Sequence, residues 1–396
     1  MARRDGYLRV LLLAGLLAGC VTDHDALQKR PDAGSSAGAG GVLGGAGAPS
    51  VIGGTSGDDA TGGHADDEPL GKSLLTLVNG VVDAPSVVLC LAKVDPSGGA
   101  TPFGQPLTDK PFAYGENLVL TDVSGASVDT DTLEPMIIAG ELELIAGLDC
   151  EAAVARAQDE EALAIDANTR AAGAGAGGEG GAADSNADAG AGGASSHEQP
   201  SRLRVRGLPA LPAGTLRAGR SILFVATGCM GGSAYDAPSS EEYCGTGYSE
   251  DQPTLSAVLV SLSRRTQFGE TGLQFVHASF ATPSVDVSSH PPFPSKDTGV
   301  QIATGVIEGQ ASPHSALLTH SALEYGSANF YQVQLSTQGT PVSGEPWLDV
   351  LARGGVKSLQ DGSTYALVLL GPRADHIQPT RLWNPMALTV VPVEPP

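Results

Sequence analysis

The sequence predicts an all-β protein of short strands, folded as a sandwich or a barrel. Short runs rich in apolar and β-branched residues recur along the chain, and clusters of Asp, Gly, Pro and Ser separate them. This strand pattern starts again in the second half, which predicts two related modules in tandem. Two Gly- and Ala-rich segments have no apolar period, so we expect them to be disordered chain outside the folded modules.

The composition limits the classes of partner. The chain has 396 residues and a formal net charge of −22, with 17% charged and 5% aromatic residues. This charge disfavours nucleic acid, because affinity for nucleic acid comes from neutralising phosphates with Lys and Arg. It also disfavours attraction to anionic lipid and favours an exposed, soluble surface. We therefore expect no nucleic-acid partner.

The N-terminus has the pattern of an export signal. Arg3, Arg4 and Arg9 precede the apolar run 10–18, and small residues stand at its end. The run is about half of the roughly 20 residues that a membrane-spanning helix needs. We therefore expect residues 1–19 to be a signal peptide that is removed, and not a transmembrane helix.

The end of this segment, Leu17-Ala18-Gly19-Cys20, resembles the lipobox of bacterial lipoproteins. The resemblance implies cleavage before Cys20 and acylation of its thiol, so that the membrane becomes a partner through a lipid anchor. Val21 stands where inner-membrane members of that family carry Asp. This implies an outer-membrane lipoprotein of the cell envelope, facing the periplasm or the cell surface. The alternative is a plain secretory signal with a chance cysteine.

Four further cysteines remain, namely Cys90, Cys150, Cys229 and Cys244. An even number in an exported protein indicates disulfides. Of the three pairings, the favoured one joins Cys90 to Cys150 and Cys229 to Cys244. In the chain-entropy model these bridges are worth about 4 and about 3 kcal/mol. The alternatives are free buried thiols and, more weakly, a zinc site.

Residues 20–72 have the composition of a flexible tether, since they are rich in Gly, Ala, Ser, Thr and Pro. A coil of this length has a reach of roughly 40 Å, enough to hold a domain clear of lipid headgroups. The first β module is expected over residues 73–265. Its expected strands are 74–78, 87–91, 118–120, 136–138, 142–145, 203–205, 221–226 and 255–260.

An insert is expected at residues 151–200 of this module. Residues 151–168 are rich in Ala, Glu, Gln and Leu without Gly or Pro, which predicts a helix with Asp149 as its N-cap. Residues 171–199 return to Gly and Ala. They include a formal G-x-G-x-x-G at 173–178, but it follows no expected strand and opens no expected helix, so it does not indicate dinucleotide binding.

A long polar loop lies between Cys229 and Cys244. It contains Tyr235, Tyr243 and the acidic pair Glu241-Glu242. Binding residues are concentrated on loops that a rigid scaffold holds, so this loop is a candidate contact surface for an envelope protein or a polysaccharide.

A second module is expected over residues 269–396, because three groups of residues repeat in the same order. Residues 275–287 echo 77–89 at a constant offset of 198 positions. The other two echoes are Tyr325-Gly326 with Tyr114-Gly115, and 359–368 with 216–225.

At these residues the chain resembles the family called domain of unknown function 4397. The resemblance is carried by paired segments in each module, 276–279 with 283–287 and, more loosely, 78–79 with 83–87. The ending of the family motif, with Gly, Tyr, Val and Gly at spacings of three, resembles 219–228 and 362–371. The resemblance implies an exported, immunoglobulin-like β-sandwich, often in tandem, and it implies no reaction.

No nucleophile elbow, phosphate-binding loop, zinc-protease motif or calcium-binding loop occurs in the sequence. Asp129-Thr130-Asp131 is an isolated acidic pair of the kind found in solvated turns. The alternative is a contribution to a Ca²⁺ site, which would need six or more oxygen ligands from several segments. His277 is expected to hydrogen-bond backbone at a strand end, and His314 and His320 fit no common metal spacing. We therefore expect no metal and no cofactor.

Two functions remain from the sequence. The favoured one is a membrane-anchored, non-enzymatic protein whose tandem β modules serve adhesion or interaction. The alternative is an envelope carbohydrate-binding protein or hydrolase. A deep pocket with converging carboxylates or histidines would favour the alternative.

Overall fold

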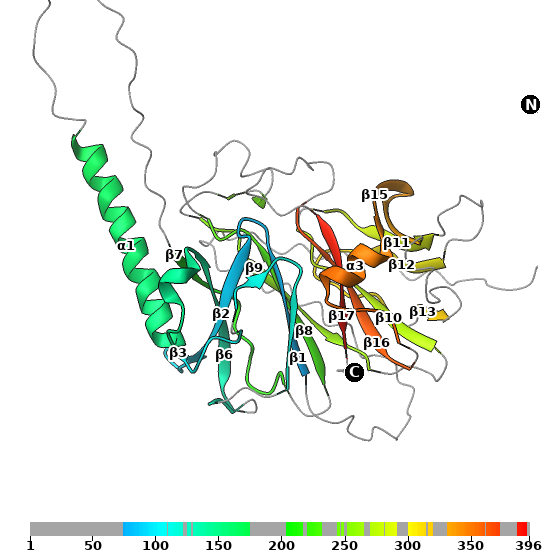
Figure 1. The fold of residues 1–396 in the computed structure, drawn as a ribbon, viewed down its shortest axis with the longest axis horizontal. Helices are drawn as coiled ribbons and strands as arrows, with labels where there is room; N and C mark the ends of the chain where they lie inside the picture. The colour runs from blue at the N-terminus through cyan, green and yellow to red at the C-terminus, as the bar shows by residue number, and fades with distance from the viewer. Residues whose placement is uncertain are drawn as a thin grey trace, which may run out of the picture. The chain divides into compact units, whose positions relative to one another are not determined.

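Short strands dominate the fold, which confirms the all-β class. The computed structural model describes residues 74–108, 110–121, 125–127, 130–174, 203–216, 220–231, 244–245, 247–248, 252–264, 270–280, 282–290, 300–313, 316–319, 331–360, 362–372 and 386–393. All of them belong to one unit, Ala48–Pro396. The described part contains four sheets and two α-helices (Figure 1).

Two sheets lie in the first half of the chain. The first inner sheet has the order β5 (Asn117–Leu120), β1 (Leu74–Val81), β8 (Ser221–Gly228) and β9 (Ser256–Leu262). The first outer sheet has the order β3 (Ala100–Phe103), β2 (Ser86–Val94), β6 (Thr132–Gly140) and β7 (Leu203–Gly207), with β4 (Phe112–Ala113) also paired to β2.

The second half repeats this arrangement. The second inner sheet has the order β13 (Ala316–Thr319), β10 (Glu270–His277), β16 (Thr364–Leu370) and β17 (Ala387–Pro392). The second outer sheet has the order β12 (Val300–Val306), β11 (Val285–His290), β14 (Gln332–Thr337) and β15 (Thr340–Pro346). Strand order and the sense of every neighbouring pair agree, including the parallel pairs β1–β8 and β10–β16.

The register also agrees residue by residue. Leu75 is paired with Ile222, and Leu273 is paired with Tyr365. These pairs keep the offset of 198 between the first strands and the offset of 143 between the 216–225 and 359–368 segments. The sequence echoes at the start and the end of each half therefore mark equivalent strand positions.

The inner sheets are buried on both faces. In β8, Phe224 faces a core shared with the first outer sheet, whereas Val225 faces a core shared with the second half. In β16, Leu367 and Val368 alternate in the same way. Strand β1 is covered on both faces in this way, so it has no side that faces solvent and is buried at every position.

Equivalent positions of the two halves meet in the core between the inner sheets. Val78 and Val276 both belong to it, as do Val225 and Val368. A hydrogen bond also joins the two halves: the fully buried Thr389 hydroxyl donates to the Gly115 carbonyl at 2.9 Å.

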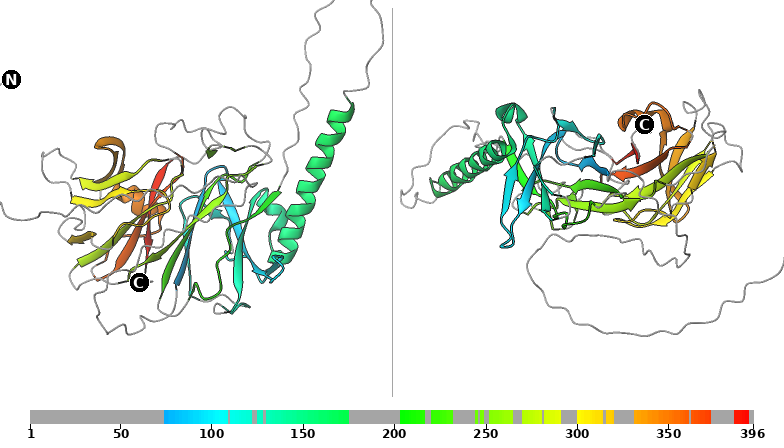
Figure 2. Two further views of the ribbon diagram at one scale, coloured as in Figure 1. Left: turned by 180° about the vertical axis from the view of Figure 1, so that it is seen from behind. Right: turned by 90° about the horizontal axis from the view of Figure 1, so that it is seen from below.

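Helix α1 (Cys150–Ala174) begins where the sequence predicts and extends beyond residue 168. Asp149 is its N-cap, since its carboxylate accepts a hydrogen bond from the Ala152 N–H at 2.8 Å. Figure 1 shows α1 beside β7, and Figure 2 shows from two further directions that it continues away from the sheet.

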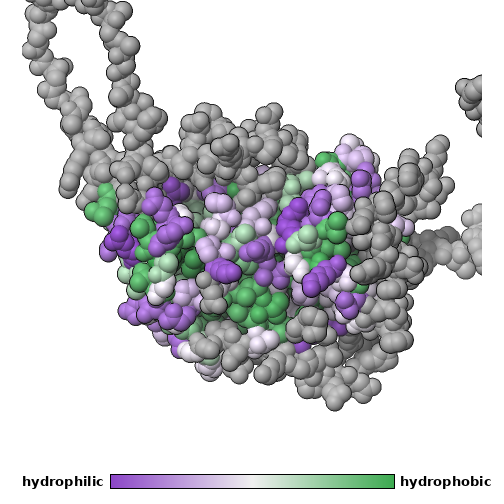
Figure 3. Space-filling view, in the orientation of Figure 1, coloured by the Kyte–Doolittle hydropathy of each residue, from purple (hydrophilic) through white to green (hydrophobic). Residues whose placement is uncertain are grey.

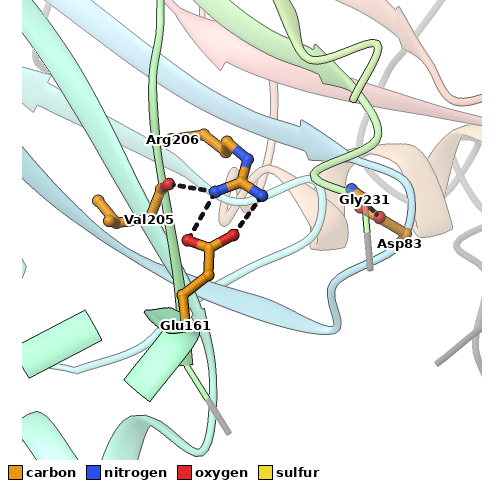
Figure 4. Close-up of polar contacts among 5 residues, drawn as sticks. All are labelled: Asp83, Glu161, Val205, Arg206 and Gly231. Carbon is orange, nitrogen blue, oxygen red and sulfur yellow. Dashed lines mark hydrogen bonds and ion pairs between the residues drawn. The ribbon is translucent and has the colours of Figure 1, made fainter. Parts of the chain in front are cut away.

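The first part of α1 covers the outer face of the first outer sheet. A disulfide joins Cys150 to Cys90 of β2, with a Cα–Cα distance of 5.6 Å, and Ala153 packs in the same core. Arg206 of β7 donates two hydrogen bonds to the Glu161 carboxylate at 2.9 and 2.6 Å (Figure 4). The outer face of the second outer sheet is different, because polar residues stand at the equivalent positions.

One predicted strand is wrong. Residues 142–145 form the 3₁₀ helix η1 (Leu142–Ile145). Leu142 and Ile145 are both buried, and their spacing of three residues places them on one side of a helical turn. The remaining predicted strands lie in or overlap β1, β2, β5, β6, β7, β8 and β9.

One echo is misplaced. Gly115 donates its N–H to the Asn79 carbonyl at 2.7 Å, and Gly309 donates to the His277 carbonyl at 2.9 Å. The two glycines have φ of 79° and 81°. The counterpart of Gly115 is therefore Gly309, and the predicted counterpart, Tyr325-Gly326, lies outside the described residues.

Candidate functional site

A groove of about 610 Å³ lies where the two halves meet. Its volume is within the range of small-ligand sites. The first half contributes a segment that ends in β5, and the second half contributes the end of helix α3 (Trp347–Arg353) with the turn after it. The lining residues are Leu107, Thr108, Lys110, Pro111, Phe112, Glu116, Asn117, Leu118, Ala352, Arg353, Gly354 and Gly355.

Helix α3 was not predicted from the sequence, and it forms one wall of the groove. Trp347, Val350 and Leu351 are buried at the i, i+3 and i+4 positions of a helical face. Gly354 follows, and a Cβ there would collide with the backbone carbonyl of Val390. The helix therefore ends where its backbone is pressed against β17 (Figure 1).

One hydrogen bond and one close approach tie the walls together. The Asn117 side chain donates to the Gly354 carbonyl at 2.7 Å. A Cβ on Gly115 would lie 2.7 Å from Cδ of Arg353, so glycine leaves room for that side chain. Arg353 pairs with Glu345 at 2.9 Å and also donates to a backbone carbonyl of β17.

The groove combines apolar and charged groups. Leu107 and Leu118 are partly buried and pack on the core of the first half. Lys110 is exposed and makes no ion pair among the residues that the structure describes. The Glu116 carboxylate accepts the Ala113 N–H at 2.8 Å. Figure 3 shows patches of hydrophobic residues among hydrophilic ones on one face of the molecule.

The second disulfide lies near the same junction. Cys229 is bonded to Cys244, as expected, and the pair packs against Val82 of the first half and Phe280 of the second. Residues 232–243, which include Tyr235, Glu241-Glu242 and Tyr243, lie outside the described residues. The loop that the sequence favoured as a contact surface therefore has no structural description.

Asp83 holds the chain next to this disulfide. Its carboxylate accepts a hydrogen bond from the Met230 N–H at 2.8 Å. It accepts a second from the Gly231 N–H at 3.0 Å, which Figure 4 shows. Burial raises the pKa of the Asp83 carboxyl to about 6, against the lowering effect of these two hydrogen bonds. Asp83 therefore titrates in a mildly acidic range.

His277 ends strand β10 and bonds backbone, as the sequence predicts. Its Nε2 lies 3.2 Å from the Pro283 carbonyl, and its Nδ1 has no partner among the described residues. Burial lowers the pKa of His277 to about 4. At the offset of 198, the first half has Asn79, whose side chain donates to the Phe112 carbonyl at 2.8 Å.

The remaining sequence candidates form no cluster. Asp131 accepts the Ser127 N–H and pairs with Lys93 at 3.1 Å, contacts that lower its pKa, so it is a turn residue. Asp129, His314, His320 and Cys20 lie outside the described residues. Within the described ranges, no group of His, Cys, Asp and Glu is arranged to hold a metal ion, and no helix has the length and apolar character for a membrane span.

One Ser–His contact bears on catalysis. The Ser288 hydroxyl lies 2.7 Å from Nε2 of His290 on the outward face of β11. A serine nucleophile needs a base that a third group orients. No described residue hydrogen-bonds the other ring nitrogen of His290, so this pair lacks the arrangement of a catalytic triad in the described part of the chain.

Comparison with known proteins adds no assignment. No protein-family model matches the chain, and no curated protein matches it.

Proposed function

We propose that this protein is a lipid-anchored, non-enzymatic protein of the outer membrane, with two tandem immunoglobulin-like modules that bind a partner in the groove between them. The observation that carries the proposal is that both halves build the groove. Leu118 of β5 lies in one wall and Arg353 of α3 in the other. The Asn117–Gly354 hydrogen bond holds these walls in a fixed relation.

The repeated strand order supports the modular part of the proposal. Each half has an inner sheet with one parallel pair and an antiparallel outer sheet, packed around its own core. Two layers around a core are the architecture of a β-sandwich. The lipobox-like segment Leu17-Ala18-Gly19-Cys20 supports the anchor, since acylation of a cysteine attaches an exported protein to a membrane.

The binding function is tested by affinity capture from envelope extract with the full-length protein in mild detergent. Lys110→Glu changes the groove, and Lys357→Glu is the matched control, because both lysines are exposed and only Lys110 lines the groove. We expect the groove variant to lose proteins or polysaccharides that the wild type and the control retain. Identical captures by all three proteins would reject the groove as the binding site.

The anchor has its own test. Cys20→Ser removes the thiol that acylation requires, so we expect the protein to leave the membrane fraction. Fractionation followed by immunoblotting measures this, with Cys229→Ser as a control for the loss of a cysteine. A Cys20→Ser protein that still fractionates with membranes would contradict the lipid anchor.

The carbohydrate-binding or hydrolase alternative has one observation in its favour, the Ser288–His290 contact. Ser288→Ala would abolish an activity that depends on this hydroxyl. A hydrolysis assay on envelope polysaccharides and esters in which wild type and Ser288→Ala are equally inactive would exclude this pair as a catalytic centre for those substrates.

A further inference from the structure

We propose that the groove binds a short free peptide that carries both an ammonium group and a carboxylate group. This inference rests on the proposed function of the groove and names the class of its ligand. Three features of the lining support it: two opposite charges without ion-pair partners in the described part of the chain, an apolar wall, and the size of the groove.

The two charges are those of Lys110 and Glu116, which both line the groove and are both exposed. Neither forms an ion pair with the other or with any further residue that the structure describes. One oxygen of the Glu116 carboxylate accepts the Ala113 N–H at 2.8 Å, which orients the carboxylate. Arg353 adds no third free charge, because it is paired with Glu345. The groove therefore offers one positive and one negative group, and its electrostatic complement is a ligand with one charge of each sign.

Asn117 adds a neutral acceptor at the same edge of the groove. Its side-chain nitrogen donates to the Gly354 carbonyl at 2.7 Å, so the amide is held in place. Its side-chain oxygen accepts no hydrogen bond from the described residues. An ammonium group has three N–H donors and no acceptor, so it can donate to the Glu116 carboxylate and to a neutral oxygen at the same time.

The remaining lining and the size of the groove favour a short peptide over other zwitterions. Leu107 and Leu118 are partly buried apolar residues that aliphatic side chains of a ligand can contact, and a single small amino acid would leave them uncovered. The volume of about 610 Å³ is that of a small-molecule site. A short free peptide presents both of its charged ends within such a volume, whereas a segment inside a folded protein has no free ends. An acidic polysaccharide would supply the carboxylate alone.

The test is isothermal titration calorimetry of the full-length protein in mild detergent with four forms of the tripeptide Ala-Leu-Ala. The first form has both ends free, the second is acetylated at its N-terminus, the third is amidated at its C-terminus, and the fourth carries both caps. The variants are Lys110→Gln and Glu116→Gln, and the glutamine at position 116 keeps an oxygen that can accept the Ala113 N–H. Lys357→Gln and Glu143→Gln are the matched controls, since both residues are exposed and neither lines the groove.

We expect the peptide with free ends to bind, and each single cap to raise Kd by about threefold or more, because each cap removes one charge contact. Lys110→Gln should raise Kd for the free and acetylated forms and leave that of the amidated form unchanged within about twofold. Glu116→Gln should raise Kd for the free and amidated forms and leave that of the acetylated form unchanged within about twofold. The two controls should bind every form as the wild type does.

Equal binding of all four forms, or a dependence on one end only, would overturn the zwitterionic class. An equal effect of either variant on capped and free forms would show that the charge acts through the fold and not on the ligand, and would overturn it as well. If no form binds while the capture experiment above still depends on Lys110, this inference is rejected and the groove remains a binding site. If that capture is also unaffected, both proposals fail.

Discussion

Two buried titratable groups should give the stability of this protein opposite dependences on pH. His277 has a pKa lowered to about 4 by burial, and Asp83 has a pKa raised to about 6 by burial. Both side chains are at least nine-tenths buried. We predict that His277→Asn and Asp83→Asn change the pH profile of unfolding in opposite senses.

The magnitudes follow from linkage. Histidine in an unfolded chain has a pKa near 6.5, so between pH 6.5 and 4 the unfolded chain binds this proton more readily than the folded one. His277 therefore removes about 3 kcal/mol of stability as the pH falls through this range. Asp83 does the reverse. Its folded pKa lies above the unfolded value of 3.8, so it contributes about 3 kcal/mol of stability below pH 3.8 that is lost as the pH rises to 6.

The assay is equilibrium urea unfolding of the full-length protein at closely spaced pH values from 3.5 to 8, followed by tryptophan fluorescence. The wild type should show nearly cancelling effects from these two groups. Relative to the wild type, His277→Asn should gain about 3 kcal/mol on acidification, and Asp83→Asn should lose about 3 kcal/mol. Asn is the natural choice at position 277 because Asn79 occupies the equivalent position in the first half.

A constant loss of stability from packing shifts a whole curve without changing its slope, so the comparison of slopes is independent of that loss. The double variant His277→Asn/Asp83→Asn should restore a profile parallel to that of the wild type. If the two single variants run parallel to the wild type between pH 4 and 6.5, neither group titrates as its burial requires, and the reasoning is wrong.

Three further changes test the fold. Replacing Cys90 and Cys150 together by Ser should cost about 4 kcal/mol in the chain-entropy model, measured by chemical denaturation; an unchanged midpoint would mean that the bridge does not constrain the unfolded chain. Gly228→Ala should lower the free energy of unfolding by about 3 kcal/mol or more, because φ is 90° and a Cβ would collide with a backbone carbonyl. Gly98→Ala is the control, since φ is 88° but a Cβ would meet open space, and it should cost about 1–2 kcal/mol. Equal losses of stability in the two variants would refute the collision. Arg206→Ala should cost about 1 kcal/mol or less, since the ion pair is partly exposed, and should speed hydrogen exchange in α1; unchanged exchange would show that the pair does not hold the helix.

Much of the sheet structure could be predicted because apolar runs and turn residues act locally. The strand predicted at 142–145 is wrong, because apolar residues at 142 and 145, separated by two residues, suit a short helical turn as well as a strand. Helix α3 could have been found from its own pattern. Trp347, Val350 and Leu351 have helical spacing, and Gly354 follows the last turn.

The groove could not be predicted, because it depends on contacts between segments far apart in sequence. Asn117 and Gly354 are 237 positions apart, and neither stands in a motif that indicates binding. The misplaced Tyr325-Gly326 echo has a similar cause. A match of two residues carries little information, whereas the positive φ of the turn requires glycine at position 309.

The core between the inner sheets has a further consequence for how the halves associate. Val78 of the first half and Val276 of the second are equivalent positions, and both lie in this shared core. The same surface of each half therefore faces the other, as in a two-fold symmetric dimer. A dimer of separate chains dissociates on dilution. Here both partners are parts of one polypeptide, so their local concentration is set by the linker and not by the amount of protein present. The pairing should therefore persist at any dilution the cell imposes.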